Sequence, residues 1–370
     1  MVTSICLCLI IVTLASSSRL VCYYNSLAED RAEYGKFTVS DIDPNKCTHL
    51  IYAFSDINNQ HELVPSRATD IQQYEAFNGL KTRNPLLKTL LAVGGLTFNT
   101  QKTADNRLLI TASVSAEKAI IDASYEVPQI AKYLDFINVL TFDFHGPWES
   151  VTGHHSPLYQ RSQDTGNKTY FNTDFAMQYW RDQGAPPEKI NMGLAAYGRA
   201  FNLSSASSNV EEPANGPGEE GCYTGEEGFW AYYEICLYLE GVTPQLITDQ
   251  KVPYAIAENQ WVGFDNNDSL NTKASYLKAN NFGGAFIWSL DLDDKSGQFC
   301  KTVKCPLISH LHALLVPGFP DLSTTNTTST APKTTPTTIT TTPAPPTTAA
   351  ATTAAPTTTA EDPVSPPQTR

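Results

Sequence analysis

The chain has no surplus of basic residues, since 25 Lys and Arg stand against 38 Asp and Glu, for a formal net charge of −13. Nucleic-acid phosphates repel an acidic surface, so we do not expect nucleic-acid binding. Acidic charge also serves solubility, and by itself it identifies no partner. No C-x-x-C pair occurs, which argues against a zinc site, and we expect no other metal or cofactor.

Long apolar runs are also nearly missing. One run, at 5–15, lies inside a leader at 1–18 that ends in the small residues Ala15 to Ser18. This pattern is typical of a secretory signal peptide, and the run is too short to span a bilayer. We therefore expect a secreted, extracellular and monomeric protein without a membrane span.

Cysteines and sequons fit a secreted chain. Removal of the leader leaves an even number of cysteines, which indicates disulfides. The remaining cysteines are Cys22, Cys47, Cys222, Cys236, Cys300 and Cys305. The N-x-S/T sequons, which are candidate glycosylation sites, lie at Asn167, Asn202, Asn267 and Asn326.

Composition changes abruptly near Pro317, and from Asp321 onwards Thr, Pro, Ala and Ser dominate. A segment without apolar periodicity cannot bury a core, so we expect disorder over residues 317–370. Thr/Pro-rich tracts are typical of O-glycosylated, mucin-like stalks, and a plain flexible linker is the alternative.

Residues 20–316 have the pattern of a globular domain. Short runs rich in β-branched and aromatic residues occur at 21–25, 48–54, 89–94, 108–114, 136–144, 190–197 and 283–290. Several of these runs are continuously apolar, as expected of parallel strands that are buried on both faces.

Helical periodicity separates these runs at 70–80, 172–183 and 270–278, with Asp70 and Ser269 as the predicted caps of the first and last helices. Strand alternating with helix predicts an α/β fold with a parallel sheet or barrel. A Gly/Pro-punctuated stretch at about 201–268 breaks this alternation and predicts a small inserted α+β lobe before the last strand.

Four motifs resemble the animal chitinases of glycoside hydrolase family 18. They are CTHLIYAF at 47–54, LTFDFHGPW at 140–148, AYGRAF at 196–201 and GGAFIWSLDLDD at 283–294. The resemblance covers nearly all of residues 20–316. It implies a TIM barrel with a lobe after strand seven, and enzymes that cleave β-1,4 links between N-acetylglucosamine units of chitin.

The acid of such enzymes, the Glu of a D-x-x-D-x-D-x-E motif on strand four, has no counterpart here. No D-x-D-x-E string occurs, and residues 97–107 lead directly into the run at 108–114, which resembles the family's fifth strand. We therefore expect a (β/α)8-type barrel lacking strand four, which is marginal or misfolded, distorted, or closed with seven strained strands. Alternative splicing and an incomplete gene model both remain open as its origin.

The resemblance also implies a sugar-binding cleft. Its residues are Tyr23, Phe54, Phe142, Asp143, Tyr197, Arg199 and Trp288. Trp288 would floor the central sugar and Asp143 would contact its acetamido group. Phe142 replaces a Tyr of the family, and Leu27 and Leu96 stand where Trp is common.

We assign no catalytic residue, because no other carboxylate projects from the position of strand four. The carboxylates considered are Asp143, Glu149, Asp291, Asp293 and Asp294. By resemblance, disulfides are expected at Cys22–Cys47 and Cys236–Cys300. Cys222–Cys305 follows by arithmetic alone, with free thiols as the alternative.

These features predict a secreted chitinase-family protein that binds chitin or N-acetylglucosamine oligomers without hydrolysing them. Two alternatives remain. One is an active endochitinase of chitin catabolism, through a substitute acid or a longer transcript, and the other is a non-functional splice product. Whether the chain is an enzyme is therefore left open.

Overall fold

The computed structural model describes residues 18–58, 60, 62–93, 109–204, 206 and 209–319, which all lie in one compact unit. The expected leader up to residue 17, the expected stalk from residue 320, and the stretch 94–108 with the predicted break are outside the described residues. Among the described helices, none has both the length and the apolar character needed to cross a bilayer.

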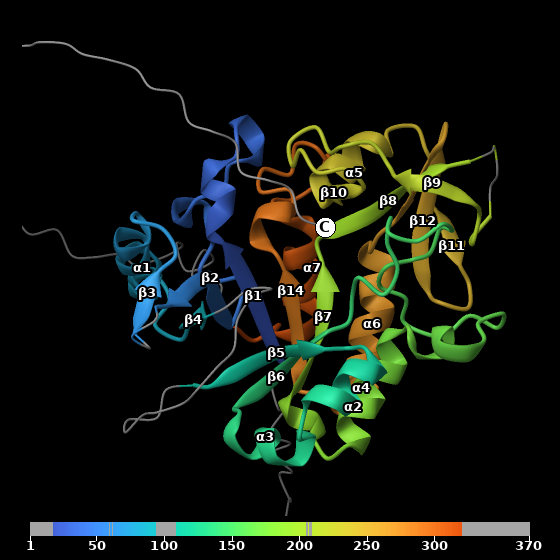
Figure 1. The fold of residues 1–370 in the computed structure, drawn as a ribbon. Helices are drawn as coiled ribbons and strands as arrows, with labels where there is room; N and C mark the ends of the chain where they lie inside the picture. The colour runs from blue at the N-terminus through green and yellow to red at the C-terminus, as the bar shows by residue number, and fades with distance from the viewer. Residues whose placement is uncertain are drawn as a thin grey trace, which may run out of the picture. The chain divides into compact units, whose positions relative to one another are not determined.

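The principal sheet is parallel and curled (Figure 1). Its order is β4 (Lys88–Val93), β2 (His49–Ile57), β1 (Arg19–Asn25), β14 (Gly284–Trp288), β7 (Ile190–Ala195), β6 (Phe136–Leu140) and β5 (Thr111–Ser115). A short strand, β3 (Leu63–Pro65), pairs antiparallel with β2. Each predicted strand is present, although β6 ends at Leu140 rather than at residue 144.

Within the part of the chain that the structure describes, this order is that of a (β/α)8 barrel without a fourth strand between β4 and β5. Among the described residues, β4 pairs only with β2 and β5 only with β6, so the alternative of a closed seven-stranded barrel is wrong there. Burial follows the same pattern. Val21 and Ile51 are buried inside the curl, whereas Leu90 on β4 is half-buried and Ser113 on β5 is exposed.

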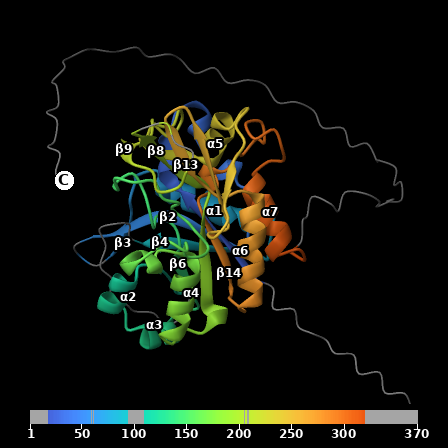
Figure 2. The same ribbon diagram turned by 90° about the vertical axis from the view of Figure 1, so that its right-hand side faces the viewer.

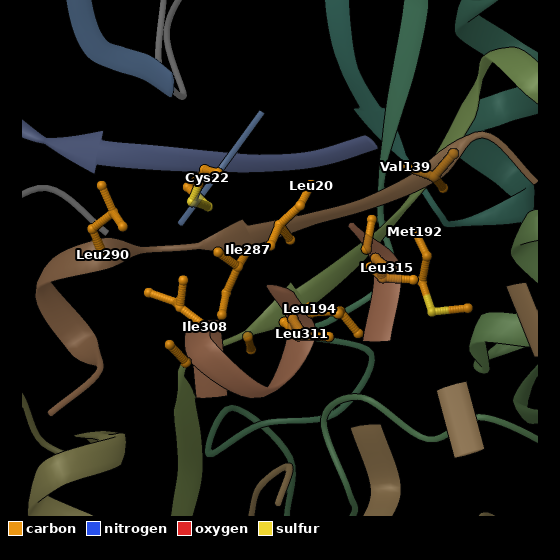
Figure 3. Close-up of a cluster of buried hydrophobic side chains, with 14 of the residues drawn as sticks. Leu20, Cys22, Val139, Met192, Leu194, Ile287, Leu290, Ile308, Leu311 and Leu315 are labelled. Carbon is orange, nitrogen blue, oxygen red and sulfur yellow. A yellow bond between two sulfur atoms is a disulfide. The ribbon is translucent and has the colours of Figure 1, made fainter. Parts of the chain in front are cut away.

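Helices cover the outer face of the sheet (Figure 2). They are α1 (Asp70–Gly79), α2 (Lys118–Ser124), α3 (Val127–Tyr133), α4 (Thr173–Asp182), α6 (Asn267–Ala279) and α7 (Pro306–Leu315). Figure 3 shows buried side chains between α7 and the outer face of β1, β7 and β14, namely Leu20, Leu194, Ile287, Ile308, Leu311 and Leu315.

Both predicted helix caps are wrong, the first by one residue and the second by three. Thr69 is the N-cap residue of α1, and the Asp70 carboxylate instead accepts a hydrogen bond from the Tyr52 hydroxyl at 2.8 Å. Asn266 caps α6, and Ser269 is its reciprocal partner three residues later. Such a capping box satisfies two backbone donors, so the helix begins before the apolar pattern does.

The inserted lobe lies between β7 and β14 in the chain and contains an antiparallel sheet. Its elements are β8 (Tyr197–Leu203), β9 (Ala214–Pro217), β10 (Phe229–Ala231), α5 (Tyr232–Tyr238), β11 (Gln245–Ile247), β12 (Val252–Ala257) and β13 (Gln260–Gly263). The α+β lobe before the last strand is therefore present, and its first strand begins at Tyr197, four residues earlier than residue 201.

Two disulfides are present, Cys22–Cys47 and Cys236–Cys300. The first joins β1 to the start of β2, and the second joins α5 to the segment after β14. The third expected bridge does not form, because Cys222 and Cys305 are free thiols. Burial raises the pKa of Cys305 to about 12, which keeps it protonated at neutral pH.

A chain of polar side chains crosses the inside of the curled sheet. Arg19 donates to Asn191 at 3.2 Å, Asn191 donates to Asn138 at 2.9 Å, and Asn138 donates to the Tyr23 hydroxyl at 3.1 Å. The Tyr23 hydroxyl also bonds to the Ser113 hydroxyl at 2.6 Å. The chain thus connects β1 across the interior to β5, the strand at the open edge.

We predict that Tyr23→Phe lowers the free energy of unfolding by about 1–3 kcal/mol, because it deprives the buried Asn138 amide of an acceptor. Urea denaturation measures the change. Tyr233→Phe is the matched control. Its buried hydroxyl has no hydrogen-bond partner among the described residues, so its removal should cost little. Equal effects of the two substitutions would contradict the prediction.

His49 makes the fold sensitive to acid. Burial, with help from Lys88 and Arg19, lowers the pKa of His49 from 6.5 to about 4. The unfolded chain therefore takes up a proton at higher pH than the folded one. Taken alone, the contribution of His49 to the free energy of unfolding should be complete above pH 6.5 and should fall by roughly 3 kcal/mol towards pH 4.

His49→Gln should flatten this dependence, as melting temperatures measured between pH 4 and 7 would show. His310→Gln, at a half-buried position on α7 where the side chain bonds Asn271, is the control. A His49→Gln variant that keeps the full acid dependence would refute the assignment.

Candidate carbohydrate-binding site

The expected cleft residues gather at the carboxyl ends of the parallel strands. In a barrel these ends are where binding side chains converge. Tyr23 lies on β1 and Phe54 on β2, and Trp288 is the last residue of β14. Phe142 and Asp143 follow shortly after the end of β6. Tyr197 and Arg199 belong to β8, which follows β7 after one residue.

Trp288 forms a floor of rings with its neighbours. Its indole lies 5.9 Å from the Phe54 ring at an interplanar angle of 29°, and 5.3 Å from the Tyr23 ring. Trp288 and Phe54 are half-buried, while Tyr23 is buried below them. Half-buried, stacked rings of this kind offer a flat apolar face to a ligand.

Asp143 is held by a two-pronged ion pair with Arg199. Arg199 Nε lies 2.9 Å from Asp143 Oδ1, and its Nη2 lies 3.0 Å from Oδ2. Burial alone would raise the pKa of Asp143, but His155 and Arg199 outweigh it and hold the pKa well below the ordinary value. Asp143 is therefore an ionised acceptor and not a proton donor at neutral pH.

His155 lies behind this ion pair. It is fully buried against the Tyr197 ring, and its Nδ1 is 3.6 Å from Asp143 Oδ1, beyond hydrogen-bond reach. Burial lowers the pKa of His155 although Asp143 opposes the effect. Its neighbour His154, also buried, donates from Nε2 to the Phe264 carbonyl at 3.0 Å. His154 and His155 are thus packing residues of the segment between β6 and α4.

Phe142 lacks the hydroxyl of the Tyr that the resemblance implies at this position. Its ring lies 6.1 Å from Tyr197 and 5.9 Å from Phe286, within the cluster of rings inside the sheet. Leu27 is 61% exposed at the carboxyl end of β1. Leu96 lies outside the described residues, so its place is not described.

The other carboxylates considered as substitute acids are engaged elsewhere. Glu149 bonds His145 at 2.9 Å, and Asp291 bonds Arg31 at 2.6 Å. Asp293 accepts from the backbone of α7, and Asp294 accepts from Tyr34 and from the backbone near Cys300.

One exposed aromatic side chain was not predicted as a site residue. Trp148 is 61% exposed, and the Arg199 guanidinium lies 5.6 Å from its ring centre. The rings of Tyr197 and Phe229 flank the same guanidinium at 5.4 and 5.2 Å. The Gly-Pro-Trp sequence at 146–148 was the available signal, since Gly and Pro together mark a turn and turns lie at the surface.

Family comparison agrees with this geometry. The profile described as "Glycosyl hydrolases family 18" matches residues 19–103 and 96–293. The chain belongs to glycosyl hydrolase family 18. Chitinase-3-like protein 2 of Homo sapiens is 40% identical over 357 residues, covering 79% of this chain and 91% of the relative. Chitotriosidase-1 of Mus musculus is 40% identical over 371 residues, covering 82% of this chain and 79% of that relative.

Solved family 18 structures share the fold. Human YKL-39, described as "a pseudo-chitinase with retained chitooligosaccharide binding properties", superposes with a TM-score of 0.77 at 39% identity, covering 81% of this chain and 100% of that one. Ostrinia furnacalis Group IV chitinase superposes with a TM-score of 0.75 at 34% identity, covering 80% of this chain and 99% of that one.

The family 18 match is interrupted at the open edge of the sheet. The profile matches in two pieces that meet at 96–103, between β4 and β5. The alignment to Chitinase-3-like protein 2 runs over 357 residues but uses 79% of the 370 residues here, or about 292. About 65 aligned positions of that relative therefore have no residue in this chain.

Gly146 permits the position of Trp148. A Cβ added at Gly146 would lie 2.2 Å from the Trp148 ring. We predict that Gly146→Ala displaces the indole, which near-UV circular dichroism would show against a Trp148→Phe reference. Gly79→Ala, where an added Cβ meets nothing within 4 Å, is the control. An unchanged Gly146→Ala spectrum would disprove this packing.

Proposed function

We propose that this protein is secreted and binds chitin or N-acetylglucosamine oligomers without hydrolysing them. The observation that carries the proposal is the contrast within the site. The rings of Trp288, Phe54 and Tyr23 lie in contact, whereas Asp143 is held ionised beside Arg199 and so has no proton to donate at neutral pH.

Binding is supported by the chemistry of the floor. The C–H faces of a pyranose ring pack on aromatic faces, and Trp288 offers the largest of these. The ionised Asp143 can accept a hydrogen bond from an acetamide N–H, and charge-assisted bonds of this kind are strong. YKL-39, with 39% identity, is named for chitooligosaccharide binding, which supports the same ligand class here.

Absence of hydrolysis is supported by the lack of a proton donor. The leaving oxygen of a glycoside must be protonated as its bond breaks, and a positioned acid contributes roughly 10²–10⁴-fold. Asp143 has a lowered pKa and Glu149 is held by His145. No D-x-D-x-E string is present to supply another acid.

Secretion and glycosylation are part of the proposal. The apolar leader, the disulfides and the family membership favour an extracellular protein. Asn167 and Asn267 are exposed, as N-linked glycans require, while Asn202 is half-buried and accepts from Asn259 at 2.9 Å. Asn326, the remaining proposed site, lies outside the described residues.

Calorimetric titration with chitohexaose tests binding. We expect Trp288→Ala to weaken it about 10-fold or more, as for truncation of a central aromatic contact. Leu246→Ala, at an exposed apolar position on β11, should leave it unchanged. Failure of the unmodified protein to bind would instead favour a non-functional product.

A fluorogenic chitobioside tests catalysis in the same preparation. We expect no release of fluorophore above that of buffer, because the chain has no D-x-D-x-E string and Asp143 and Glu149 are held by Arg199 and His145. Turnover at the rate of an active family enzyme would overturn the proposal and establish a substitute acid.

A further inference from the structure

The segment after β14 contains a buried polar contact next to the ring floor. The Ser289 hydroxyl donates to Asp291 Oδ1 at 2.6 Å, and Arg31 Nη1 donates to Asp291 Oδ2 at 2.6 Å. Ser289 follows Trp288 directly and is fully buried, as is the Asp291 side chain. A buried carboxylate with one cation as its partner strongly resists separation from it.

Arg31 belongs to another part of the fold. It is the C-cap residue of a 3₁₀ turn, η1 (Ser26–Asp30), that follows β1. The ion pair therefore joins the loop after β1 to the loop after β14, two strands that are hydrogen-bonded neighbours. The same two strands carry Trp288 and Tyr23, whose rings are in contact.

The neighbouring carboxylates have different partners. Asp293 bonds the first turn of α7, and Asp294 bonds Tyr34 and the backbone near Cys300. Among these acidic residues at 291–294, Asp291 is the one whose described contacts reach the residue beside Trp288.

We propose that Ser289, Asp291 and Arg31 form a clamp that positions Trp288 for stacking on a sugar. The backbone on one side of Trp288 is fixed by strand pairing with β1 and β7, and the Trp288 carbonyl accepts from Ala196 at 2.9 Å. The clamp fixes the other side. The idea rests on the proposed sugar-binding function, and the clamp residues themselves need not touch the ligand.

A fluorine label on tryptophan distinguishes an effect on the position of Trp288 from an effect on the stability of the fold. The chain has five Trp residues, so protein containing 5-fluorotryptophan should give a ¹⁹F spectrum in which Trp288→Phe identifies the Trp288 signal. We expect Ser289→Ala and Asp291→Asn to shift or broaden that signal without ligand. Arg31→Lys, which keeps the charge, should preserve it better than Arg31→Ala.

Affinity for chitohexaose should follow the same order. Loss of one hydrogen bond in Ser289→Ala should weaken binding about fivefold to tenfold. Asp294→Asn, which removes a carboxylate of the same acidic run, is the matched control and should leave the Trp288 signal and the affinity unchanged.

The outcomes distinguish the two proposals. If the unmodified protein does not bind chitohexaose, the proposed function is wrong. The clamp is still tested in that case, because the ¹⁹F signal of Trp288 is measured without ligand. If Ser289→Ala and Asp291→Asn lower the melting temperature but leave the Trp288 signal in place, the residues are only structural and the clamp is refuted.

Discussion

A strand inside a parallel sheet needs a hydrogen-bonded neighbour on each side, and this requirement governs the present structure. Among the described residues, β4 and β5 each have one such neighbour, so the sheet curls like a barrel without closing. The polar chain from Arg19 to Ser113 links β1 to β5 across the inside of the sheet. It gives β5 a second attachment, in addition to its backbone pairing with β6. Side-chain hydrogen bonds thus help to hold β5 in place, as strand pairing on both sides does for the inner strands of the sheet.

The gap between β4 and β5 also bears on the proposed function. The ring floor and the Asp143–Arg199 pair come from β1, β2, β6, β8 and β14, which all lie in the paired part of the sheet or in the lobe. The general acid would come from the strand between β4 and β5. Under the proposed function, the residues for sugar binding and those for proton transfer lie on different strands, so the first set can be present without the second.

The sequence could predict the strands because buried parallel strands are continuously apolar, and the motifs located Asp143, Arg199 and Trp288 by likeness. It could not predict contacts that depend on three-dimensional neighbours. Asn138 and Asn191 lie in apolar runs yet bond each other inside the sheet. The caps at Asp70 and Ser269 were misplaced because capping depends on backbone geometry before the apolar pattern starts, and cysteine parity could not show that Cys222 and Cys305 are unpaired.

The Cys236–Cys300 disulfide has a consequence for how the cleft behaves. It fastens α5 of the lobe covalently to the segment that follows β14, shortly after Trp288. A swing of the lobe would therefore pull on the strand that bears the ring floor. The lobe is therefore linked to the segment after β14 by this covalent bond as well as by the backbone, and the bond limits how far α5 can move away from that segment.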